Sequence, residues 1–342
     1  MNELTEIIAA FDELCRDGKP AALALVIGVE GSSYRRPGAR MLTAEDGRSW
    51  GGVSGGCLER DVARRARGVI VSGQCAICRY DSSEDEEISP GAATGCGGVV
   101  EILIQPVSRT SPGPMSLLKD AVHNRREVKL ATAIRSGEFQ IGRHILLDEG
   151  FSPLPAEDFF VETISPPQAL VIFGSGPDAA PLCAIAKTLG WQVTIVASRP
   201  ATFAARRFAA ADAIVITSSD DPLADVEISP RSAVVVMTHN LARDERILAL
   251  LPRSLRYVGL LGPRARAERI MRNVPRDLSE VFAPVGLDLG AQTPQEIALA
   301  IAAEIQAAIR HAPAASLRDQ VGPIHPRVVQ QADCGLAAAP MR

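Results

Sequence analysis

The sequence predicts an α/β protein with two domains, a mixed α/β domain at the N-terminus and a doubly wound parallel sheet at the C-terminus. The length of 342 residues fits about two domains. The composition, 46% hydrophobic and 22% charged, is typical of a globular protein. In the second half of the chain, short β-branched runs alternate with helical segments, which indicates a parallel sheet with crossover helices.

The proline-rich stretch at 152–168 places the main domain boundary near residue 166. We therefore expect an N-terminal domain over 1–108, then a connecting segment over 109–165 that holds a helix and some short strands. The parallel-sheet domain is expected over 166–310. Residues 311–342 are rich in alanine and proline and are expected to form a flexible tail.

The elements of the N-terminal domain follow from hydrophobic periodicity. Apolar residues recur at helical spacing over 3–16, which predicts a helix, and the run "PAALALVIGV" (20–29) predicts a buried strand. A turn-rich segment comes next. The further elements expected here are a strand at 40–44, a helix at 58–70 and strand-like stretches near 74–83 and 97–107.

Six short apolar runs predict the strands of the parallel sheet. They lie at 169–174, 191–197, 213–217, 233–239, 257–262 and 282–286. The helix at 293–310 closes the domain, with Thr293 as N-cap, Pro294 in the first turn and Glu296 completing a capping box. Isoleucines at 297, 301, 305 and 309 form an apolar stripe on this helix, which fits either the domain core or a dimer interface.

Charge and targeting signals narrow the functional classes. The net charge of −4 gives no reason to expect binding to nucleic acid or to an anionic membrane. No apolar run approaches the roughly 18 residues of a membrane-spanning helix. The first residues are acidic, unlike the basic start of a signal peptide. Seven scattered cysteines indicate reduced thiols, so we expect a cytoplasmic protein.

The stretch "VIFGSGPDAAPL" carries a candidate phosphate-binding loop. Gly174, Gly176 and Ala179 match G-x-G-x-x-G/A between a predicted strand and helix, which indicates a Rossmann-like domain. Backbone N–H groups and the helix N-terminus would favour a diphosphate there. The second strand ends in Ser198 and Arg199 where an acid would bind NAD ribose, so NADP or a phosphorylated pterin fits better. A tight turn in an empty Rossmann-like fold remains the alternative.

Other loops are expected to leave the same carboxyl edge of the sheet, where ligands of doubly wound folds bind. They contribute His239 and Asn240, Arg264, and Asp288 as further candidate cofactor-binding residues. His239 and Arg264 could bind an anion, and Asp288 could accept hydrogen bonds from hydroxyl or amino groups. A structural role is the alternative for a single histidine such as His239.

The stretch "GGVSGGCLERDV" (51–62) sets Cys57 on a glycine turn at the start of a predicted helix. Gly55 and Gly56 free the backbone, and a helix N-terminus stabilises a thiolate. Thiolate is the form that binds soft metals or carries sulfur. The alternative is a small buried residue in a tight turn.

Basic residues and a second cysteine accompany Cys57. Arg35, Arg36 and Arg40 precede it and could hold an anion. Cys96 in "TGCGG" repeats the glycine-flanked cysteine, with a structural role as its alternative.

Taken together, these segments resemble the XdhC/CoxI family over about residues 10–310. In the N-terminal domain the similar segments are "GSSYRRPGARM" (31–41), "SGGCLE" (54–59) and "GCGG" (95–98). In the C-terminal domain they are "MTHN" (237–240), "YVGLLGPR" (257–264) and "APVGLDLGAQTPQEIALAI" (283–301).

The resemblance implies an accessory chaperone for molybdenum hydroxylases such as xanthine dehydrogenase, a binding and delivery factor with no catalysis of its own. It implies that the protein binds molybdenum cofactor (molybdopterin or its dinucleotide), protects it during sulfuration and inserts it into an apo-enzyme. A cysteine desulfurase, the apo molybdenum hydroxylase and a second copy of the chain are the implied partners. The family motif makes Cys57 the cofactor- and metal-binding residue.

The sequence departs from the family pattern in two places. Pro177 stands where a histidine is frequent, and "ASR" (197–199) stands where acids are frequent. These departures leave open whether the Rossmann-like domain binds NADP, a pterin nucleotide or nothing. An NADP-dependent oxidoreductase or a nucleotide-binding regulatory protein is the alternative function.

Overall fold

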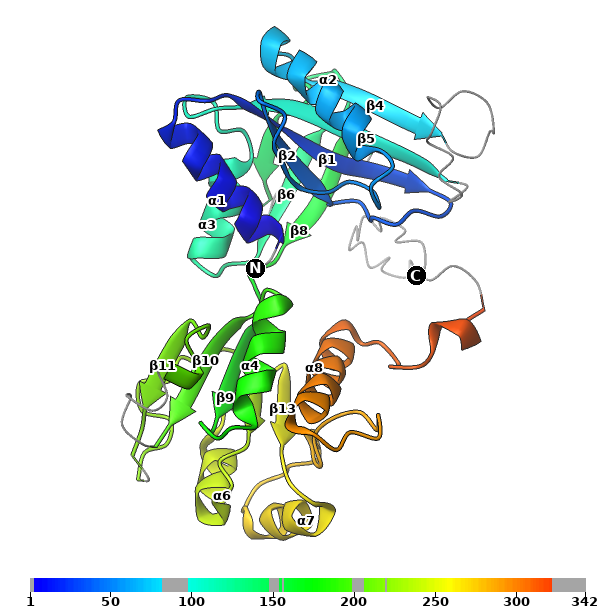
Figure 1. Cartoon of the computed structure of the whole chain (residues 1–342). Helices are drawn as coiled ribbons and strands as arrows, with labels where there is room; N and C mark the ends of the chain where they lie inside the picture. Colours follow the sequence, from blue (N-terminus) through cyan, green and yellow to red (C-terminus); the bar gives the residue numbers. More distant parts are fainter. Residues whose placement is uncertain are drawn as a thin grey trace, which may run out of the picture. The chain divides into compact units, whose positions relative to one another are not determined.

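The computed structural model describes residues 3–81, 98–147, 154–155, 157–198, 206–218 and 220–321. The chain forms two compact units, Glu3–Pro166 and Pro167–Gln320 (Figure 1). The first is a mixed α/β unit and the second contains a parallel six-stranded sheet. The predicted fold class is confirmed. Cys96, Arg199 and residues 322–342 of the expected tail lie outside the described residues.

The N-terminal unit is built on a five-stranded sheet with the order β3-β2-β1-β5-β4, in which all neighbours are antiparallel. The strands are β1 (Ala21–Glu30), β2 (Arg40–Ala44), β3 (Ser49–Gly51), β4 (Ala76–Asp81) and β5 (Val99–Val107). Its helices are α1 (Glu3–Arg16), α2 (Glu59–Ser72) and α3 (Met115–His123).

The long central strand β1 is buried on both faces, and its alternation explains how the unit is layered. Leu23 packs with α1 and α3 on one face, while Ala24 and Val26 pack against α2 on the other. In Figure 1, α2 and α1 accordingly cover different faces of the sheet. Burial on both faces fits the continuous apolar run that predicted this strand.

Residues 109–165, predicted as a connecting segment, contribute α3 and a second sheet to the same compact unit. This antiparallel sheet has the order β7-β6-β8, with β6 (Val128–Ala133), β7 (His144–Leu146) and β8 (Phe159–Ile164). Leu118, Leu130 and Ile164 share one core with α1. The segment is therefore a packed layer of the N-terminal unit.

The C-terminal unit has a six-stranded parallel sheet with the order β11-β10-β9-β12-β13-β14. Its strands are β9 (Ala169–Phe173), β10 (Gln192–Ala197), β11 (Ala213–Ile216), β12 (Ala233–Val236), β13 (Tyr257–Leu260) and β14 (Val281–Phe282). The strand order reverses between β9 and β12, which is the switch point where ligands bind in such folds.

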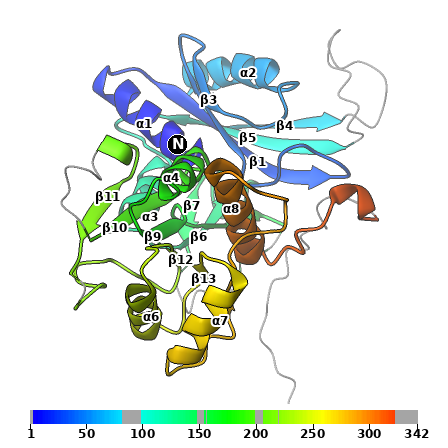
Figure 2. The ribbon, with the colours of Figure 1, turned by 60° about the horizontal axis from the view of Figure 1, so that its bottom comes forward.

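Helices cover both faces of this sheet. They are α4 (Ala179–Thr188), α6 (Leu241–Leu250), α7 (Arg264–Asn273) and α8 (Pro294–Arg310). Leu182 of α4 and Ile301 of α8 share one core, and Figure 2 shows these helices side by side. Ile247 of α6 and Ile270 of α7 belong to the core on the other face.

The last strand is shorter than the sequence predicted, and the last helix begins as predicted. β14 covers two residues instead of the expected 282–286, and Pro284 lacks the N–H that a further ladder bond would need. The capping box of Thr293 and Glu296 on α8 is confirmed. Ile301 is buried in the unit's own core, so the isoleucine stripe contributes to that core.

No helix in the described part of the chain is both long enough and apolar enough to span a membrane.

Candidate functional site

Cys57 lies exposed in a loop (residues 54–59, the Cys57 loop) that leads into α2. Gly56 adopts φ +116°, a conformation that favours glycine, and nothing lies within 4 Å of a Cβ built there. Ser54 Oγ accepts hydrogen bonds from the backbone N–H groups of Gly56 and Leu58, both at 3.1 Å. The loop is therefore folded back on Ser54, with the thiol left in solvent.

Glu59 holds the base of the Cys57 loop. Its Oε1 accepts from the backbone N–H of Ser54 at 2.8 Å and of Val53 at 3.2 Å, and its Oε2 accepts from Ser54 Oγ. Burial alone would raise the pKa of Glu59, but these hydrogen bonds outweigh it and lower the pKa below its ordinary value. The ionised carboxylate thus preforms the loop at neutral pH.

The predicted neighbours of Cys57 divide into exposed and buried groups. A Cβ built on Gly55 would lie 3.4 Å from Tyr34 Cγ, so the 31–39 segment and the Cys57 loop are adjacent. Arg36 is exposed on that segment. Arg40, in contrast, is 8% exposed, forms an ion pair with Glu162 and donates to Gly38 O at 2.7 Å. Its charge is already compensated, which favours a structural role over the predicted anion-binding one.

The other cysteines in the described residues differ from Cys57. Cys15 and Cys75 are partly buried, and Cys78 and Cys183 are buried. Burial raises the pKa of the Cys15, Cys75 and Cys183 thiols and so disfavours their thiolate forms. In the described part of the chain, no three His, Cys, Asp or Glu side chains gather as a metal site would require.

The second candidate region is the carboxyl edge of the parallel sheet, where the loops after β9 and β12 meet. Gly174 has φ +140°, and a Cβ there would lie 2.4 Å from Met237 O. A Cβ on Gly176 would lie 2.5 Å from Asp178 Oδ1. Gly174 is thus required for the packing of the loops, whereas a Cβ on Gly176 would meet only the end of the Asp178 side chain.

Asp178 is the N-cap residue of α4, at the place where the G-x-G-x-x-A pattern predicts a diphosphate. Its Oδ2 lies 2.7 Å from His239 Nε2, and its side chain is 18% exposed. A carboxylate there would repel a diphosphate. His239 itself is exposed and adopts φ +59°, in the left-handed region. The structure therefore joins His239 to α4 through a hydrogen bond.

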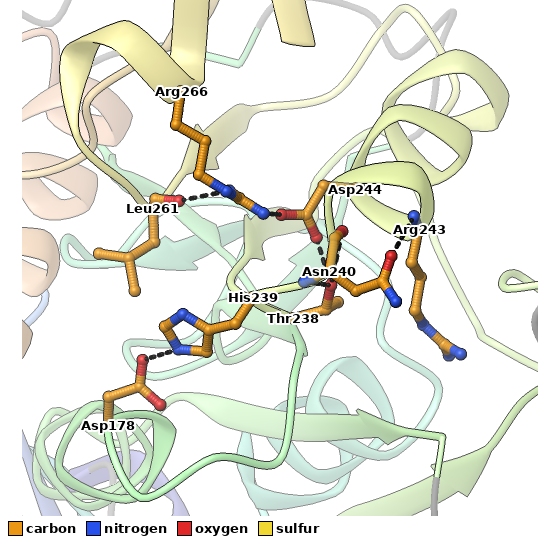
Figure 3. A network of polar contacts seen from close by, with 8 residues as sticks. All are labelled: Asp178, Thr238, His239, Asn240, Arg243, Asp244, Leu261 and Arg266. Carbon is orange, nitrogen blue, oxygen red and sulfur yellow. Dashed lines mark hydrogen bonds and ion pairs between the residues drawn. The ribbon is translucent and has the colours of Figure 1, made fainter. Parts of the chain in front are cut away.

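A polar network (Thr238, Asn240, Asp244 and Arg266, the edge network) ties the loop after β12 to α6 and α7 (Figure 3). The fully buried Asp244 carboxylate accepts from Thr238 Oγ1 at 2.5 Å and from Arg266 Nη2 at 2.7 Å. Asn240 Oδ1 caps α6 by accepting from the backbone N–H of Arg243 at 3.1 Å. Asn240, predicted to bind a cofactor, thus has a helix-capping role.

Sequence reasoning missed Arg243, Asp244 and Arg266. Arg243 and Asp244 follow the predicted loop at 237–240, and Arg266 is the last residue of the predicted loop at 260–266. None of the three matches a motif, so only their place in the first turns of α6 and α7 could have indicated them. Arg264 and Asp288, which were predicted, are exposed. Asp288 Oδ1 accepts from the N–H of Gly290 at 3.4 Å.

Comparisons with known proteins place both units in one family. Residues 14–81 match the model of the XdhC and CoxI family, and residues 170–305 match that of the XdhC Rossmann domain. A Bacillus subtilis (strain 168) protein, named as a probable subunit of xanthine dehydrogenase, is 30% identical over 317 residues, covering 86% of this chain and 94% of the relative.

Two further relatives agree. The molybdenum cofactor insertion chaperone PaoD of Escherichia coli (strain K12) is 26% identical over 308 residues, which covers 87% of this chain and 86% of PaoD. A crystal structure of a Bacillus halodurans protein named as a xanthine dehydrogenase has a TM-score of 0.79 and 31% identity, covering 93% of this chain and 98% of that one. The chain thus belongs to the XdhC and CoxI family.

Proposed function

We propose that this chain is an accessory chaperone that binds molybdenum cofactor, protects it during sulfuration and inserts it into a molybdenum hydroxylase of the xanthine dehydrogenase type. The Escherichia coli relative is named as a cofactor insertion chaperone, and the Bacillus subtilis relative as part of a xanthine dehydrogenase, which supports this role. The protein would deliver molybdenum cofactor without catalysing a reaction itself. A cysteine desulfurase would supply the sulfur, and the apo-hydroxylase would receive the cofactor.

The exposed thiol of Cys57 on its preformed loop is the observation that carries the proposal. A thiolate is a soft ligand that suits molybdenum, and it is also the form of cysteine that carries sulfur. Cys57 is exposed and the space beside Gly56 is open, so a ligand could reach the loop from solvent. Glu59 and Ser54 would keep the thiol in one place without touching the cargo.

The alternative of an NADP-dependent oxidoreductase has less support. It needs a diphosphate at the start of α4, where Asp178 places a carboxylate. It also needs a proton donor at the sheet edge, and the exposed His239 is engaged with that same carboxylate. Both features favour a binding protein over a nucleotide-dependent catalyst.

A transfer assay tests the proposed function. Wild type, Cys57→Ala and Cys15→Ala would be purified anaerobically from a host that makes the cofactor, then mixed with cofactor-free enzyme of the xanthine dehydrogenase type. Wild type and Cys15→Ala should raise the activity of the apo-enzyme, and Cys57→Ala should not. Equal activation by all three proteins would overturn the role of Cys57, and no activation by wild type would overturn delivery itself.

A further inference from the structure

Arg243 in the first turn of α6 is a buried cation without a carboxylate of its own. The residue is 8% exposed. Its Nη2 donates to Thr217 Oγ1 at 2.6 Å, while Nη1 has no hydrogen-bond partner. Within the described residues, no ion pair reaches this guanidinium. Buried charges in proteins are normally paired, so the unsatisfied Nη1 requires an explanation.

The nearest carboxylate does not supply that explanation. Asp244 follows Arg243 in the chain, but its two oxygens are taken by Thr238 and Arg266. The ion pair with Arg266 engages the Asp244 carboxylate, so Asp244 acts on Arg243 only through its charge and without a hydrogen bond. Figure 3 shows the Arg243 guanidinium directed away from Asn240 and from the Asp244 carboxylate. Burial lowers the pKa of Arg243 and outweighs the opposing effect of the nearby Asp244 charge.

The location of Arg243 connects this charge to ligand binding. α6 follows β12 directly, and Thr217 follows β11, so both groups lie at the carboxyl edge of the sheet. Ligands of doubly wound folds bind at that edge. Both helix starts at this edge carry a carboxylate, Asp178 at α4 and Asp244 in the first turn of α6, but Asp244 is paired with Arg266.

We propose that Arg243 binds a phosphate group of a ligand at the carboxyl edge of the C-terminal unit, beside α6 and away from the G-x-G-x-x-A loop. A planar guanidinium suits phosphate because it can donate two parallel hydrogen bonds. The phosphate could belong to molybdenum cofactor or to a free nucleotide, which share this chemistry. The inference depends on Arg243 and does not rest on the proposed function.

Thermal unfolding of the full-length protein with sodium pyrophosphate tests this inference. The variants are Arg243→Met, which removes the charge, and Arg269→Met, which removes the same charge from an exposed position on α7. Pyrophosphate at about ten times its Kd should raise the Tm of wild type and of Arg269→Met by about 3–6 °C. The rise should vanish in Arg243→Met, which without ligand should unfold no earlier than wild type, because an unpaired charge has been removed.

Arg243→Lys keeps the positive charge but lacks the planar guanidinium, so pyrophosphate should raise its Tm less than it raises that of wild type. This variant keeps the test valid if Arg243→Met fails to fold. No rise in wild type, or an equal rise in the folded Arg243 variants and wild type, would overturn the inference. A marked loss of stability in Arg243→Met without ligand would also overturn it, since the charge would then be paired within the fold.

Cofactor content identifies the source of the phosphate. Wild type and Arg243→Met from a cofactor-producing host would be compared for oxidised pterin. A loss in Arg243→Met would support binding of the cofactor's own phosphate. Unchanged pterin together with a lost pyrophosphate response would support a free nucleotide, and would leave the proposed function intact. Failure of that function would be recognised separately, by pterin missing from wild type that still responds to pyrophosphate.

Discussion

Glu59→Gln should loosen the Cys57 loop while leaving the rest of the N-terminal unit folded. The carboxylate accepts three hydrogen bonds, two from the backbone N–H groups of Val53 and Ser54 and one from Ser54 Oγ. Hydrogen bonds to a charged group contribute about 1.5–3 kcal/mol each, and glutamine keeps one acceptor oxygen. We therefore expect a net loss of about 2 kcal/mol in the free energy of local opening.

Native-state hydrogen exchange of peptides that cover residues 52–59 measures this loss. A change of about 2 kcal/mol corresponds to about 30-fold faster exchange of the loop amides, including the N–H of Ser54. Amides in the centre of β1 should keep their protection, which separates local loosening from global unfolding. Loop amides that exchange at the wild-type rate in Glu59→Gln would refute the idea that Glu59 preforms the loop.

Three more substitutions test a buried histidine, a buried ion pair and a close backbone contact. Burial, with the positive charges of Arg40 and Arg143 nearby, lowers the pKa of His144 from 6.5 to about 4. Between pH 6.5 and pH 4, the unfolded chain therefore binds more protons than the folded protein. Stability should fall by up to about 3 kcal/mol as the pH falls through that window, and urea titrations of His144→Asn should lack this part of the fall. Glu162→Ala leaves the buried Arg40 unpaired and should cost about 3–5 kcal/mol in chemical denaturation; a cost below about 1 kcal/mol would contradict the pairing. Gly174→Ala adds a Cβ 2.4 Å from a backbone oxygen at φ +140° and should lower the Tm of the C-terminal unit, reflecting about 3 kcal/mol or more; an unchanged Tm would refute the close approach.

The parallel-sheet unit was largely predictable because its signals are local. β-branched runs and their helical connections follow from short segments of sequence, and the capping box at Thr293 and Glu296 defines the start of α8. The Cys57 loop was predictable for the same reason, since a glycine pair before a helix start is a local pattern. The structure adds the partners that hold this loop, Ser54 and Glu59.

The remaining features depend on contacts between distant residues. Arg40 pairs with Glu162, 122 positions later, so its burial could not be inferred from the basic segment around it. His239 meets Asp178 from another strand's loop, 61 positions away. The missing hydrogen-bond partner of Arg243 Nη1 becomes visible only in the structure, where Asp244 is bonded to Thr238 and Arg266.

Molybdenum and oxidised-pterin content, measured side by side in wild type and Cys57→Ala, tests the central claim most directly. Both proteins would be purified anaerobically from a host that makes the cofactor, with circular dichroism and Tm to show that the variant is folded. The account predicts near-stoichiometric molybdenum and pterin in wild type and their loss from folded Cys57→Ala. Equal molybdenum and pterin in the two proteins, or none in wild type under conditions that load a known carrier, would contradict it.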